Sequence, residues 1–463
     1  MSEPYDLLVI GGGIGGYVAA LRATQLGAQV ALVEKDAIGG VCLNVGCIPT
    51  KALLRSAEVY ETMRNAKDFG ISVSGEIEAD WPAMQKRKTQ IVRRLTKGVS
   101  SLLKKAKVTV LNGQGRLVGA HAAEVRGAEG TQRVEADKIV IATGSRPIQL
   151  SLPGFDLPGV LDSTAALALE ALPERLLIVG GGVIGAEFAT LFASLGVRVI
   201  VVEMLERMLP MLDADIGAAI QKSLHRRKVE AYLDSRVTRI DPAAGALHVS
   251  ATTPQGEERF EVDQVLVSVG RRANVEDLGL ETAGIAATRA GIAVDERMET
   301  NVPGVYAAGD VTGKWWLAHV SSKEGVVAAE NACGHPSQMD YKTVPSCVFT
   351  QPEAASVGLT EAQAQEQGYD VLVGRFPFMA NGKALTYGER EGFVKVVSES
   401  KYGQVLGLHV VGPHASDLIL EGGFALGMEA TLDEIEATVH AHPTLGESIA
   451  EAALAARGLA LQI

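Results

Sequence analysis

The 463-residue sequence lacks the features of a membrane, nucleic-acid-binding or disulfide-stapled protein. No apolar run reaches the roughly 18 to 20 residues that span a bilayer. The net charge of −12 argues against nucleic acid, whose phosphates need a basic face. The first six residues are polar and acidic, unlike a signal peptide or a transit sequence. Four cysteines are too few for a disulfide framework. We therefore expect a cytoplasmic protein in a reducing compartment, without membrane insertion.

The composition otherwise favours a large enzyme. Hydrophobic residues make up 47% of the chain, enough for several cores, and the 51 glycines indicate many tight turns. The length alone predicts about three domains.

A glycine-rich turn follows the first apolar strand, which we expect at residues 7–10. The glycines are Gly11, Gly13 and Gly16, in the pattern G-x-G-x-x-G. Gly11 would make the turn, Gly13 would admit a pyrophosphate, and Gly16 would permit close packing of helix on strand. The phosphates would lie at the helix N-terminus. The next predicted strand ends in Glu34, whose carboxylate suits an adenosine ribose.

The same pattern recurs 169 positions later, with Gly180, Gly182, Gly185 and a strand that ends in Glu203. One glycine triplet is a weak signal, but chance recurrence of all these elements at identical spacing is improbable. The sequence therefore predicts two nucleotide sites. A carboxylate at position 203 suits a free 2′-hydroxyl and repels a 2′-phosphate, so NAD is favoured over NADP.

Two cysteines, Cys42 and Cys47, lie shortly after the first turn, Cys42 eight residues past Glu34. They could be buried thiols or half of a metal site. Zinc needs four ligands, usually at C-x2–4-C spacing, and neither Cys333 nor Cys347 has a second ligand close in sequence. We expect these last two to be packing residues and expect no metal site. A redox disulfide between Cys42 and Cys47 is the favoured interpretation.

The spacing of the cysteines restricts the chain between them. Five residues of a regular helix advance about 7.5 Å, more than the roughly 4.4–6.8 Å between the Cα atoms of a disulfide. The segment must therefore bend, and Gly46 and Pro49 would supply the flexibility and the interruption. We expect a helix to resume near Thr50 and to carry Lys51 through Tyr60.

A disulfide and NAD need an intermediary, because one reacts by thiolate attack and the other by hydride transfer. A flavin can do both, so the first turn would hold FAD and the second NAD. Further FAD contacts are expected where two strands end, at Thr143, Gly144 and Ser145 and at Asp310, whose carboxylate suits a sugar-like hydroxyl chain. Each of these segments alone could be an ordinary turn after a strand.

Together these motifs resemble the dihydrolipoamide dehydrogenases, which belong with glutathione and mercuric reductases to the flavin-dependent pyridine nucleotide-disulfide oxidoreductases. The resemblance runs essentially end to end, and its strongest pieces are residues 40–49, 180–187, 269–272, 309–310 and 440–444. It implies an α/β fold with two Rossmann-like dinucleotide-binding domains and a C-terminal α+β dimerisation domain. The expected parts are an FAD domain over residues 1–148, an NAD domain over 149–274, a segment completing the FAD domain over 275–344 and the dimerisation domain over 345–463.

The resemblance also implies roles for individual residues. Cys42 would be the interchange thiol that meets the substrate, and Cys47 the thiol against the flavin. Lys51 would pair with Glu187 beside the flavin's reactive nitrogen, although a solvated helix lysine is the simpler interpretation. The remaining implied cofactor-binding positions are Gly115, Ala318, Val237 and Gly270. The segment Lys314-Trp315-Trp316 departs from the family pattern, which has smaller residues there.

The C-terminal region supplies a candidate base, His442, with Glu447 five residues later. A neutral histidine, of ordinary pKa about 6.5, could take the proton of a substrate thiol, of ordinary pKa about 8.5, while Glu447 fixes its tautomer. Alternatively, Thr444-x-x-Glu447 is a capping box that begins a helix over residues 447–457, and both interpretations can hold. His440 would be a packing or orienting residue. The family builds each active site from two subunits, which implies a homodimer.

The implied reaction is oxidation of protein-bound dihydrolipoamide by NAD⁺. The partners would be lipoyl-bearing proteins of 2-oxoacid dehydrogenase complexes or of the glycine cleavage system. A glutathione reductase would usually carry a basic pair in place of Glu203, and a mercuric reductase would carry an extra cysteine pair at its C-terminus. A catalytically idle subunit is disfavoured because Cys42, Cys47 and His442 are all present. Strands near residues 371–376, 392–397 and 405–411 predict an antiparallel sheet in the dimerisation domain.

Overall fold

The computed structural model describes residues 4–463, and the chain divides into two compact units. The first unit contains the residues up to Ala52, Gln85–Ile148 and Gly270–Asp340. The second contains Leu53–Met84, Gln149–Val269 and Tyr341–Ile463. Each unit is therefore assembled from three separate segments of the sequence.

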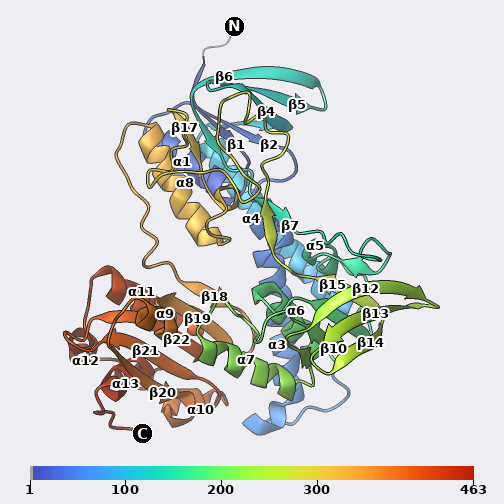
Figure 1. The fold of residues 1–463 in the computed structure, drawn as a ribbon, viewed down its shortest axis with the longest axis vertical. Coiled ribbons are helices and arrows are strands. Elements are labelled where there is room, and N and C mark those ends of the chain that lie inside the picture. The colour runs from blue at the N-terminus through green and yellow to red at the C-terminus, as the bar shows by residue number, and fades with distance from the viewer. Residues whose placement is uncertain (1–3) are drawn as a thin grey trace. The chain divides into compact units, whose positions relative to one another are not determined.

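The first unit is built on a mainly parallel sheet (Figure 1). Its strands lie in the order β3-β2-β1-β6-β5-β4, and β17 also pairs with β6. The strand bounds are β1 (Tyr5–Ile10), β2 (Val30–Glu34), β3 (Thr109–Asn112), β4 (Gln114–Gly119), β5 (Ala122–Gly127), β6 (Gly130–Ile141) and β17 (Val305–Ala307). A parallel strand is covered on both faces and so reads as a continuous apolar run. Leu7 to Ile10, at most 4% exposed, illustrate this.

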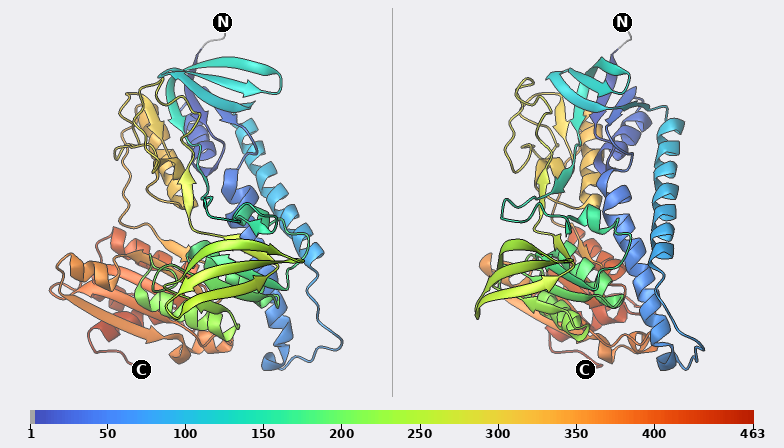
Figure 2. Two further views of the ribbon diagram at one scale, coloured as in Figure 1. Left: turned by 45° about the vertical axis from the view of Figure 1, so that its right-hand side comes forward. Right: turned by 90° about the vertical axis from the view of Figure 1, so that its right-hand side faces the viewer.

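Helices α1 (Ile14–Gln25) and α8 (Ala318–Ala332) pack side by side in this unit (Figure 1). Glycine permits the close approach, because a Cβ at Gly325 would lie 2.3 Å from the carbonyl oxygen of Gly15. The long helix α4 (Trp81–Lys105) is seen along its length in Figure 2. The other elements of this unit are α2 (Gly40–Val45), the first turns of α3 (Cys47–Arg64), the antiparallel pair β7 (Ser145–Pro147) and β16 (Arg271–Ala273), and the 3₁₀ turn η2 (Asp310–Thr312).

The second unit contains a second parallel sheet, with strand order β11-β10-β9-β15-β8. The strands are β8 (Val160–Leu161), β9 (Arg175–Val179), β10 (Arg198–Val202), β11 (Glu230–Tyr232) and β15 (Gln264–Val267). The helices that follow its strands are α5 (Ser163–Ala166), α6 (Val183–Ser194) and α7 (Ala214–Arg226). An antiparallel sheet is formed by β12 (Arg236–Ala243), β13 (Ala246–Thr253) and β14 (Gly256–Val262). The two parallel sheets confirm the predicted pair of Rossmann-like folds.

The C-terminal part of the second unit is a five-stranded antiparallel sheet, in the order β18-β19-β22-β21-β20. Its strands are β18 (Ser346–Val348), β19 (Glu353–Gly358), β20 (Val371–Pro377), β21 (Phe393–Glu399) and β22 (Val405–Gly412). The accompanying helices are α9 (Glu361–Glu366), α10 (Gly382–Thr386), α11 (Ala415–Gly427), α12 (Leu432–Ala437) and α13 (Glu447–Ala456), and short 3₁₀ turns lie at η1 (Ala66–Phe69) and η3 (Phe378–Ala380). The three strands expected from the sequence are all present, so the predicted α+β domain is confirmed.

A buried ionic cluster joins this C-terminal sheet to α7 within the second unit. Lys395 on β21 is 1% exposed, and its Nζ lies 3.0 and 3.1 Å from the two carboxylate oxygens of Asp213, the N-cap residue of α7. Asp215 and Glu361 approach the same ammonium group at 2.7 and 2.8 Å. A buried ammonium group is tolerated only when it is paired in this way.

Within residues 4–463, no helix combines the length and the apolar character needed to cross a bilayer.

Candidate active site

The first glycine turn lies at the carboxyl ends of β1 and β6. Gly11 has φ = 110°, and a Cβ there would lie 2.2 Å from the carbonyl oxygen of Ala142, so only glycine fits. A Cβ at Gly16 would lie 1.8 Å from the carbonyl oxygen of Gly11. At Gly13, in contrast, the nearest atom would be 3.9 Å away. The turn is thus tight on its strand side and open beside Gly13, where the pyrophosphate is predicted.

The second glycine turn repeats this geometry at the carboxyl ends of β9 and β15. Gly180 has φ = 104°, and its Cβ would meet the carbonyl oxygen of Ser268 at 2.7 Å. A Cβ at Gly185 would lie 2.0 Å from the carbonyl oxygen of Gly180, whereas one at Gly182 would meet no atom within 4 Å. Both turns lie where the strand order of a doubly wound sheet reverses, which is where such sheets bind their ligands.

The acids that end β2 and β10 hold the glycine turns together. Glu34 accepts hydrogen bonds at 2.7 Å from the backbone N–H groups of Gly12 and Asp36. Glu203 accepts the equivalent bonds from Gly181 and from Leu205, the latter at 2.8 Å. A carboxylate oxygen can accept more than one hydrogen bond, so ribose binding by Glu34 and Glu203 stays a prediction beside this structural role.

The middle glycines are part of this arrangement, although the fingerprint treats them as variable positions. A Cβ at Gly12 would lie 3.0 Å from the Glu34 carboxylate, and one at Gly181 would lie 3.2 Å from Cβ of Glu203. Their signal in the sequence is that both turns read Gly-Gly-Gly.

The chain bends at Gly46, between the two cysteines, as the spacing predicts. Cys42 lies in α2, which ends before Gly46 (φ = −143°, ψ = −108°), and α3 begins directly at Cys47. The expected restart near Thr50 is therefore wrong, and so is the interruption assigned to Pro49. Proline lies in the first turn of α3, where its missing N–H group costs no helical hydrogen bond. The helix continues to Arg64, beyond the expected end at Tyr60.

The thiols of the cysteine pair interact directly. A hydrogen bond with the Cys47 thiol and, after it, burial raise the pKa of Cys42 well above its ordinary value, while the charge of nearby Lys51 opposes the shift. Both effects favour the protonated form of Cys42. Lys51 therefore lies close enough for its charge to act on the Cys42 thiol, and its predicted place beside the flavin stays a prediction.

The segment that contains the cysteines is fixed to the first glycine turn. The N–H of Gly39 donates to the carbonyl oxygen of Gly12 at 2.8 Å, and a Cβ at Gly40 would lie 2.7 Å from Cα of Gly13. The Asn44 amide donates to the carbonyl oxygens of Ile38 at 3.1 Å and of Gly40 at 2.9 Å. No motif argument gives Asn44 a role, and its only signal is its position between the cysteines.

A polar cluster joins the loop after β6 to η2. The Ser145 hydroxyl donates to the Asp310 carboxylate and accepts from Nε of Arg271 at 2.8 Å. Burial raises the pKa of Asp310 above its ordinary value, although the hydrogen bond from Ser145 and the charge of Arg271 oppose the shift. Two predicted FAD residues are thus bonded to each other, and Arg271, which had no predicted role, supports them through Ser145.

Thr143 and Gly144 are held by Asn274 next to this cluster. The Thr143 hydroxyl donates to the Asn274 carbonyl oxygen at 2.8 Å, and the Asn274 amide donates back to the Thr143 carbonyl oxygen at 2.9 Å. The Asn274 backbone N–H also donates to the carbonyl oxygen of Gly144.

The other predicted cofactor positions lie on well-defined elements. Gly115, on β4, packs against β1 and β2, since a Cβ there would lie 3.1 Å from Ile10 and 3.3 Å from Val33. Ala318 begins α8, and Leu317, the N-cap residue, separates it from Lys314-Trp315-Trp316, where Trp316 is 40% exposed. These contacts stay predictions.

Two further positions, Val237 and Gly270, were predicted to bind a cofactor. Val237, on β12, is 3% exposed within an apolar core, so a cofactor could reach only its backbone. Gly270, with φ = 115°, accepts a backbone hydrogen bond from Ile148 and lies in the first unit.

Glu187 is 4% exposed on α6, and its carboxylate accepts the backbone N–H of Phe349 at 3.0 Å. Glu187 and Lys51 belong to different units, and their pairing stays a prediction.

His442 and Glu447 form a directly bonded pair. Nδ1 of His442 lies 2.7 Å from one carboxylate oxygen of Glu447, and the other oxygen accepts the Thr444 backbone N–H at 2.7 Å. Burial alone would raise the pKa of Glu447, but the hydrogen bonds from Thr444 and His442 bring it below its ordinary value. The His442 side chain is 80% exposed.

The capping box expected at this helix is only half formed. The Thr444 hydroxyl donates to the carbonyl oxygen of Ala441 instead of capping the helix, and the N-cap residue of α13 is Gly446. The helix begins at Glu447 as predicted and ends at Ala456, one residue early. His440 is bonded to Glu421 at 2.9 Å, consistent with a packing role.

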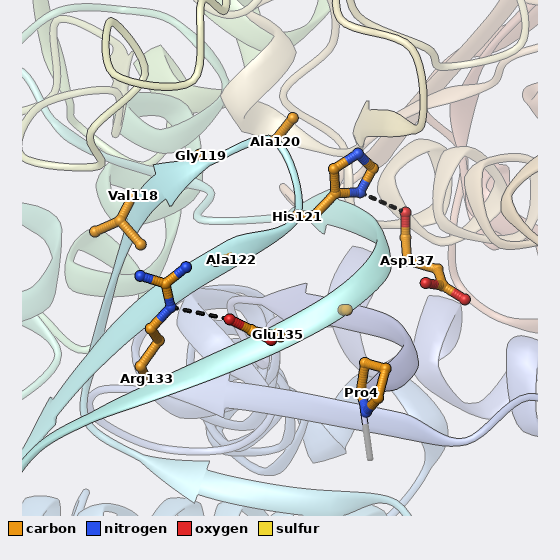
Figure 3. Close-up of a pocket in the computed structure, with 10 residues that line it drawn as sticks. Pro4, Val118, Gly119, Ala120, His121, Ala122, Arg133, Glu135 and Asp137 are labelled. Atoms are coloured by element: carbon orange, nitrogen blue, oxygen red, sulfur yellow. Dashed lines mark hydrogen bonds and ion pairs between the residues drawn. The ribbon is translucent and has the colours of Figure 1, made fainter. Parts of the chain in front are cut away.

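No group of three or more histidine, cysteine or acidic side chains is arranged to hold a metal ion within residues 4–463. A shallow polar pocket lies between the β4–β5 turn and β6 (Figure 3). Nδ1 of His121 lies 3.0 Å from the Asp137 carbonyl oxygen there, and Arg133 pairs with Glu135. None of the predicted site residues lines this pocket.

Comparison with known proteins identifies similar sequences over the whole chain. Residues 5–325 match the family described as pyridine nucleotide-disulphide oxidoreductase, and residues 344–453 match its dimerisation domain. A dihydrolipoyl dehydrogenase of Bacillus subtilis is 43% identical over 475 residues and covers all of both chains. One from Chlamydia muridarum is 45% identical and covers 98% of this chain and 97% of its own.

Solved structures of flavoprotein disulfide reductases are also similar to this chain over nearly its whole length. LpdA from Mycobacterium tuberculosis has a TM-score of 0.89 at 32% identity and covers 96% of this chain and 98% of its own. The HOCl-induced flavoprotein disulfide reductase RclA from Escherichia coli, as a Cu(II) complex, has a TM-score of 0.88 at 30% identity, with 97% and 99% coverage.

Proposed function

Because the chain belongs to the pyridine nucleotide-disulphide oxidoreductases, we propose that it oxidises protein-bound dihydrolipoamide to lipoamide with NAD⁺ as the acceptor. The observation that carries this proposal is the attachment of the cysteine segment to a dinucleotide-binding turn, through Gly39 and Gly12. Full-length relatives with 41–45% identity are named dihydrolipoyl dehydrogenase, which selects this activity within the family.

The cofactors of this family are FAD and NAD, and the two glycine turns fit them. Bound FAD supplies a ring that takes an electron pair from a thiolate and passes it to NAD⁺ as hydride. The open space at Gly13 and Gly182 matches a pyrophosphate at each turn. In the first unit, Gly11, Gly16 and Glu34 would hold FAD at the glycine turn, and the Ser145–Asp310 cluster would hold its hydroxyl chain.

His442 would act as the base toward the substrate thiol. Its Nδ1 is engaged by Glu447, which leaves Nε2 to accept the proton. The carboxylate stabilises the charged imidazolium that results, as in other catalytic pairs of an acid and a histidine. In the family this pair serves the partner subunit's cysteines, so a homodimer is part of the proposal.

The sulfur chemistry then follows by exchange. The substrate thiolate attacks Sγ of Cys42, forming a mixed disulfide and releasing Cys47 as a thiolate. The second substrate sulfur, after losing its proton, attacks the mixed disulfide, closes the lipoamide ring and leaves Cys42 reduced. The direct interaction of the two thiols supports this order, because attack at Cys42 releases the adjacent Cys47, the thiol assigned to the flavin side.

An exposed apolar stripe on α11 supports the dimer. Leu420, Phe424 and Met428 follow one another at intervals of four residues and are 63%, 73% and 66% exposed. Side chains at this spacing share one helix face, and an apolar face of this kind typically marks an interface. The expected division at residues 148, 274 and 344, the cytoplasmic location and the lipoyl-bearing partners belong to the same proposal.

The experiment that tests the function compares dihydrolipoamide, glutathione and mercuric ion as substrates, each with the NAD and the NADP cofactor. Efficient turnover only for dihydrolipoamide with NAD⁺ is expected. The Cys47→Ser variant should keep its FAD, measured by visible absorbance, and lose lipoamide turnover. Unchanged turnover in that variant, or a preference for glutathione with NADPH, would contradict the proposal.

A further inference from the structure

Helix α4 is strongly basic in an acidic protein. Its 25 residues contain eight lysines and arginines and no aspartate or glutamate, whereas the whole chain carries a net charge of −12. Such a concentration of like charge opposes folding slightly. It therefore calls for a physical explanation beyond helix formation.

Four of these cations form a stripe along one side of the helix. Lys86, Arg93, Lys97 and Lys104, called the basic stripe below, are spaced by seven, four and seven residues, which places them within about 40° of one another around the axis. All four are exposed, whereas Val99 on the opposite side is buried.

No acid within the described part of the chain neutralises this stripe. None of its four members forms an ion pair with any residue of 4–463, and neither do the adjacent Arg94 and Lys105. The stripe extends from Lys86 to Lys104, and these 18 residue steps correspond to about 27 Å along the helix axis. That length matches the face of a folded protein better than a single small anion.

The basic stripe belongs to the same unit as the cysteine pair. Nη1 of Arg87, on α4, donates to the carbonyl oxygen of Ala52 at 2.8 Å. Ala52 lies in α3, five residues after Cys47. A protein docked along α4 would therefore contact a helix that is itself bonded to α3, which carries the redox thiol and Lys51.

Two other polyanionic partners suit the stripe less well. A nucleic acid would bring many phosphates toward a chain of net charge −12. A membrane-surface helix would turn a continuous apolar face to the lipid, whereas the apolar side of α4 is only partly open: Leu103 and Val99 are buried, and Leu95 and Leu102 are 39% and 53% exposed. An acidic face of a folded protein is therefore the partner that suits the basic stripe best.

We propose that the basic stripe of α4 docks an acidic face of the protein domain that delivers the lipoyl group. This inference rests on the proposed function, because a substrate attached to a carrier domain requires a surface that receives the carrier. Charge complementarity of this kind mainly raises the association rate and selects the partner, and it weakens as salt is added.

The test uses the FAD-loaded enzyme and two substrates, free dihydrolipoamide and a recombinant reduced lipoylated domain from a 2-oxoacid dehydrogenase. The Arg93→Glu/Lys97→Glu/Lys104→Glu variant should lose about tenfold or more in kcat/KM for the lipoylated domain at low ionic strength, with the loss shrinking as salt is added. Its kcat/KM for free, uncharged dihydrolipoamide should stay within about twofold of wild type.

The matched control reverses three exposed arginines elsewhere, Arg126, Arg236 and Arg289, to glutamate, and so changes the net charge equally. This control should have a kcat/KM close to that of wild type for both substrates. Equal losses in the two triple variants, or no loss in the stripe variant, would overturn the proposal. So would stripe-dependent binding to phosphatidylglycerol vesicles with unchanged carrier kinetics. If wild type fails to oxidise free dihydrolipoamide, the proposed function itself fails, which is a separate result.

Discussion

Glu447 and His442 are bonded at 2.7 Å in a way that leaves only one nitrogen of the ring open to chemistry. The second oxygen of the same carboxylate is bound by the Thr444 backbone N–H. The acid is therefore fixed at both oxygens, and the orientation of the imidazole follows from the backbone at the start of α13.

The Glu447→Gln substitution separates charge from shape at this pair. The variant should lose about tenfold or more in lipoamide turnover, because general bases of this kind contribute about 10²- to 10⁴-fold and the amide no longer stabilises the imidazolium. Steady-state kinetics measure this effect. Turnover equal to wild type would show that His442 does not depend on the carboxylate.

The amount by which Glu447→Gln destabilises the fold should depend on pH. The pKa of Glu447 lies below its ordinary value in the folded protein. Its charged form therefore stabilises the fold at pH values above the ordinary pKa of glutamate, and that stabilisation is lost as the pH falls through the lowered pKa. The gap in melting temperature between wild type and Glu447→Gln should be present at pH 7 and should close in acid. A gap that widens in acid would contradict this assignment.

A substitution in the second glycine turn can test NAD⁺ binding without changing the stability of the fold. A Cβ at Gly182 meets no atom within 4 Å and the residue has φ = −72°, so Gly182→Ala should keep its melting temperature. The methyl group would occupy the space predicted for the pyrophosphate and should raise the KM for NAD⁺ about tenfold, equivalent to about 1.4 kcal/mol.

The matched substitution is Gly185→Ala, whose Cβ would lie 2.0 Å from the Gly180 carbonyl oxygen. It should lower both the melting temperature and NAD⁺ affinity. An unchanged KM in Gly182→Ala would place the dinucleotide elsewhere.

Lys395→Met tests the buried ionic cluster of the second unit. The substitution leaves Asp213, which is 3% exposed, without its ammonium partner. Removing one partner of a buried pair costs about 3 to 5 kcal/mol, so thermal unfolding should occur at clearly lower temperature. Lys222→Met, an exposed position on α7, is the control and should change little. Equal melting temperatures for the two variants would show that the cluster contributes no net stability.

Asn44→Asp tests the support of the cysteine segment. The substitution replaces an amide donor with a carboxylate facing the carbonyl oxygens of Ile38 and Gly40, so the segment should shift. Small displacements of reacting groups can cost up to about a hundredfold in rate. We expect a loss of lipoamide turnover of tenfold or more, with the FAD content unchanged.

Asn301→Asp is the control, because the Asn301 amide also donates to a backbone carbonyl oxygen, that of Gly284, while its oxygen accepts the Ala286 N–H, and the residue lies outside the predicted site. It should retain activity. Loss of FAD in Asn44→Asp would instead assign this residue to cofactor retention.

The sequence predicted the parts of the fold in which the local backbone geometry permits only particular residue types. The glycine turns were predictable because positions such as Gly11 and Gly16 tolerate no side chain at all. The break at Gly46 followed from disulfide geometry. The start of α3 did not, because Pro49 is compatible with both a helix interruption and a first turn, and only the whole structure distinguishes them.

The residues that hold the candidate site in place through hydrogen bonds were harder to predict. Arg271 and Asn44 act through hydrogen bonds to residues distant in sequence or to backbone carbonyl oxygens, and such partners leave no periodic pattern. The capping box at Thr444 formed only in part. The Glu447 carboxylate accepts the Thr444 N–H, but the N-cap residue of α13 is Gly446, so the Thr444 hydroxyl lies outside the cap position and donates to the Ala441 carbonyl oxygen.

The two hydrogen bonds that Glu203 accepts from the second glycine turn limit how coenzyme preference could be redesigned. Replacing this acid to admit a phosphorylated ribose would remove the acceptor of the Gly181 and Leu205 N–H groups and loosen the turn itself. The neighbouring Met204 and Leu205 are 64% and 46% exposed. Engineering toward the phosphorylated coenzyme should therefore begin by installing cations at those two side chains, with the glutamate left in place.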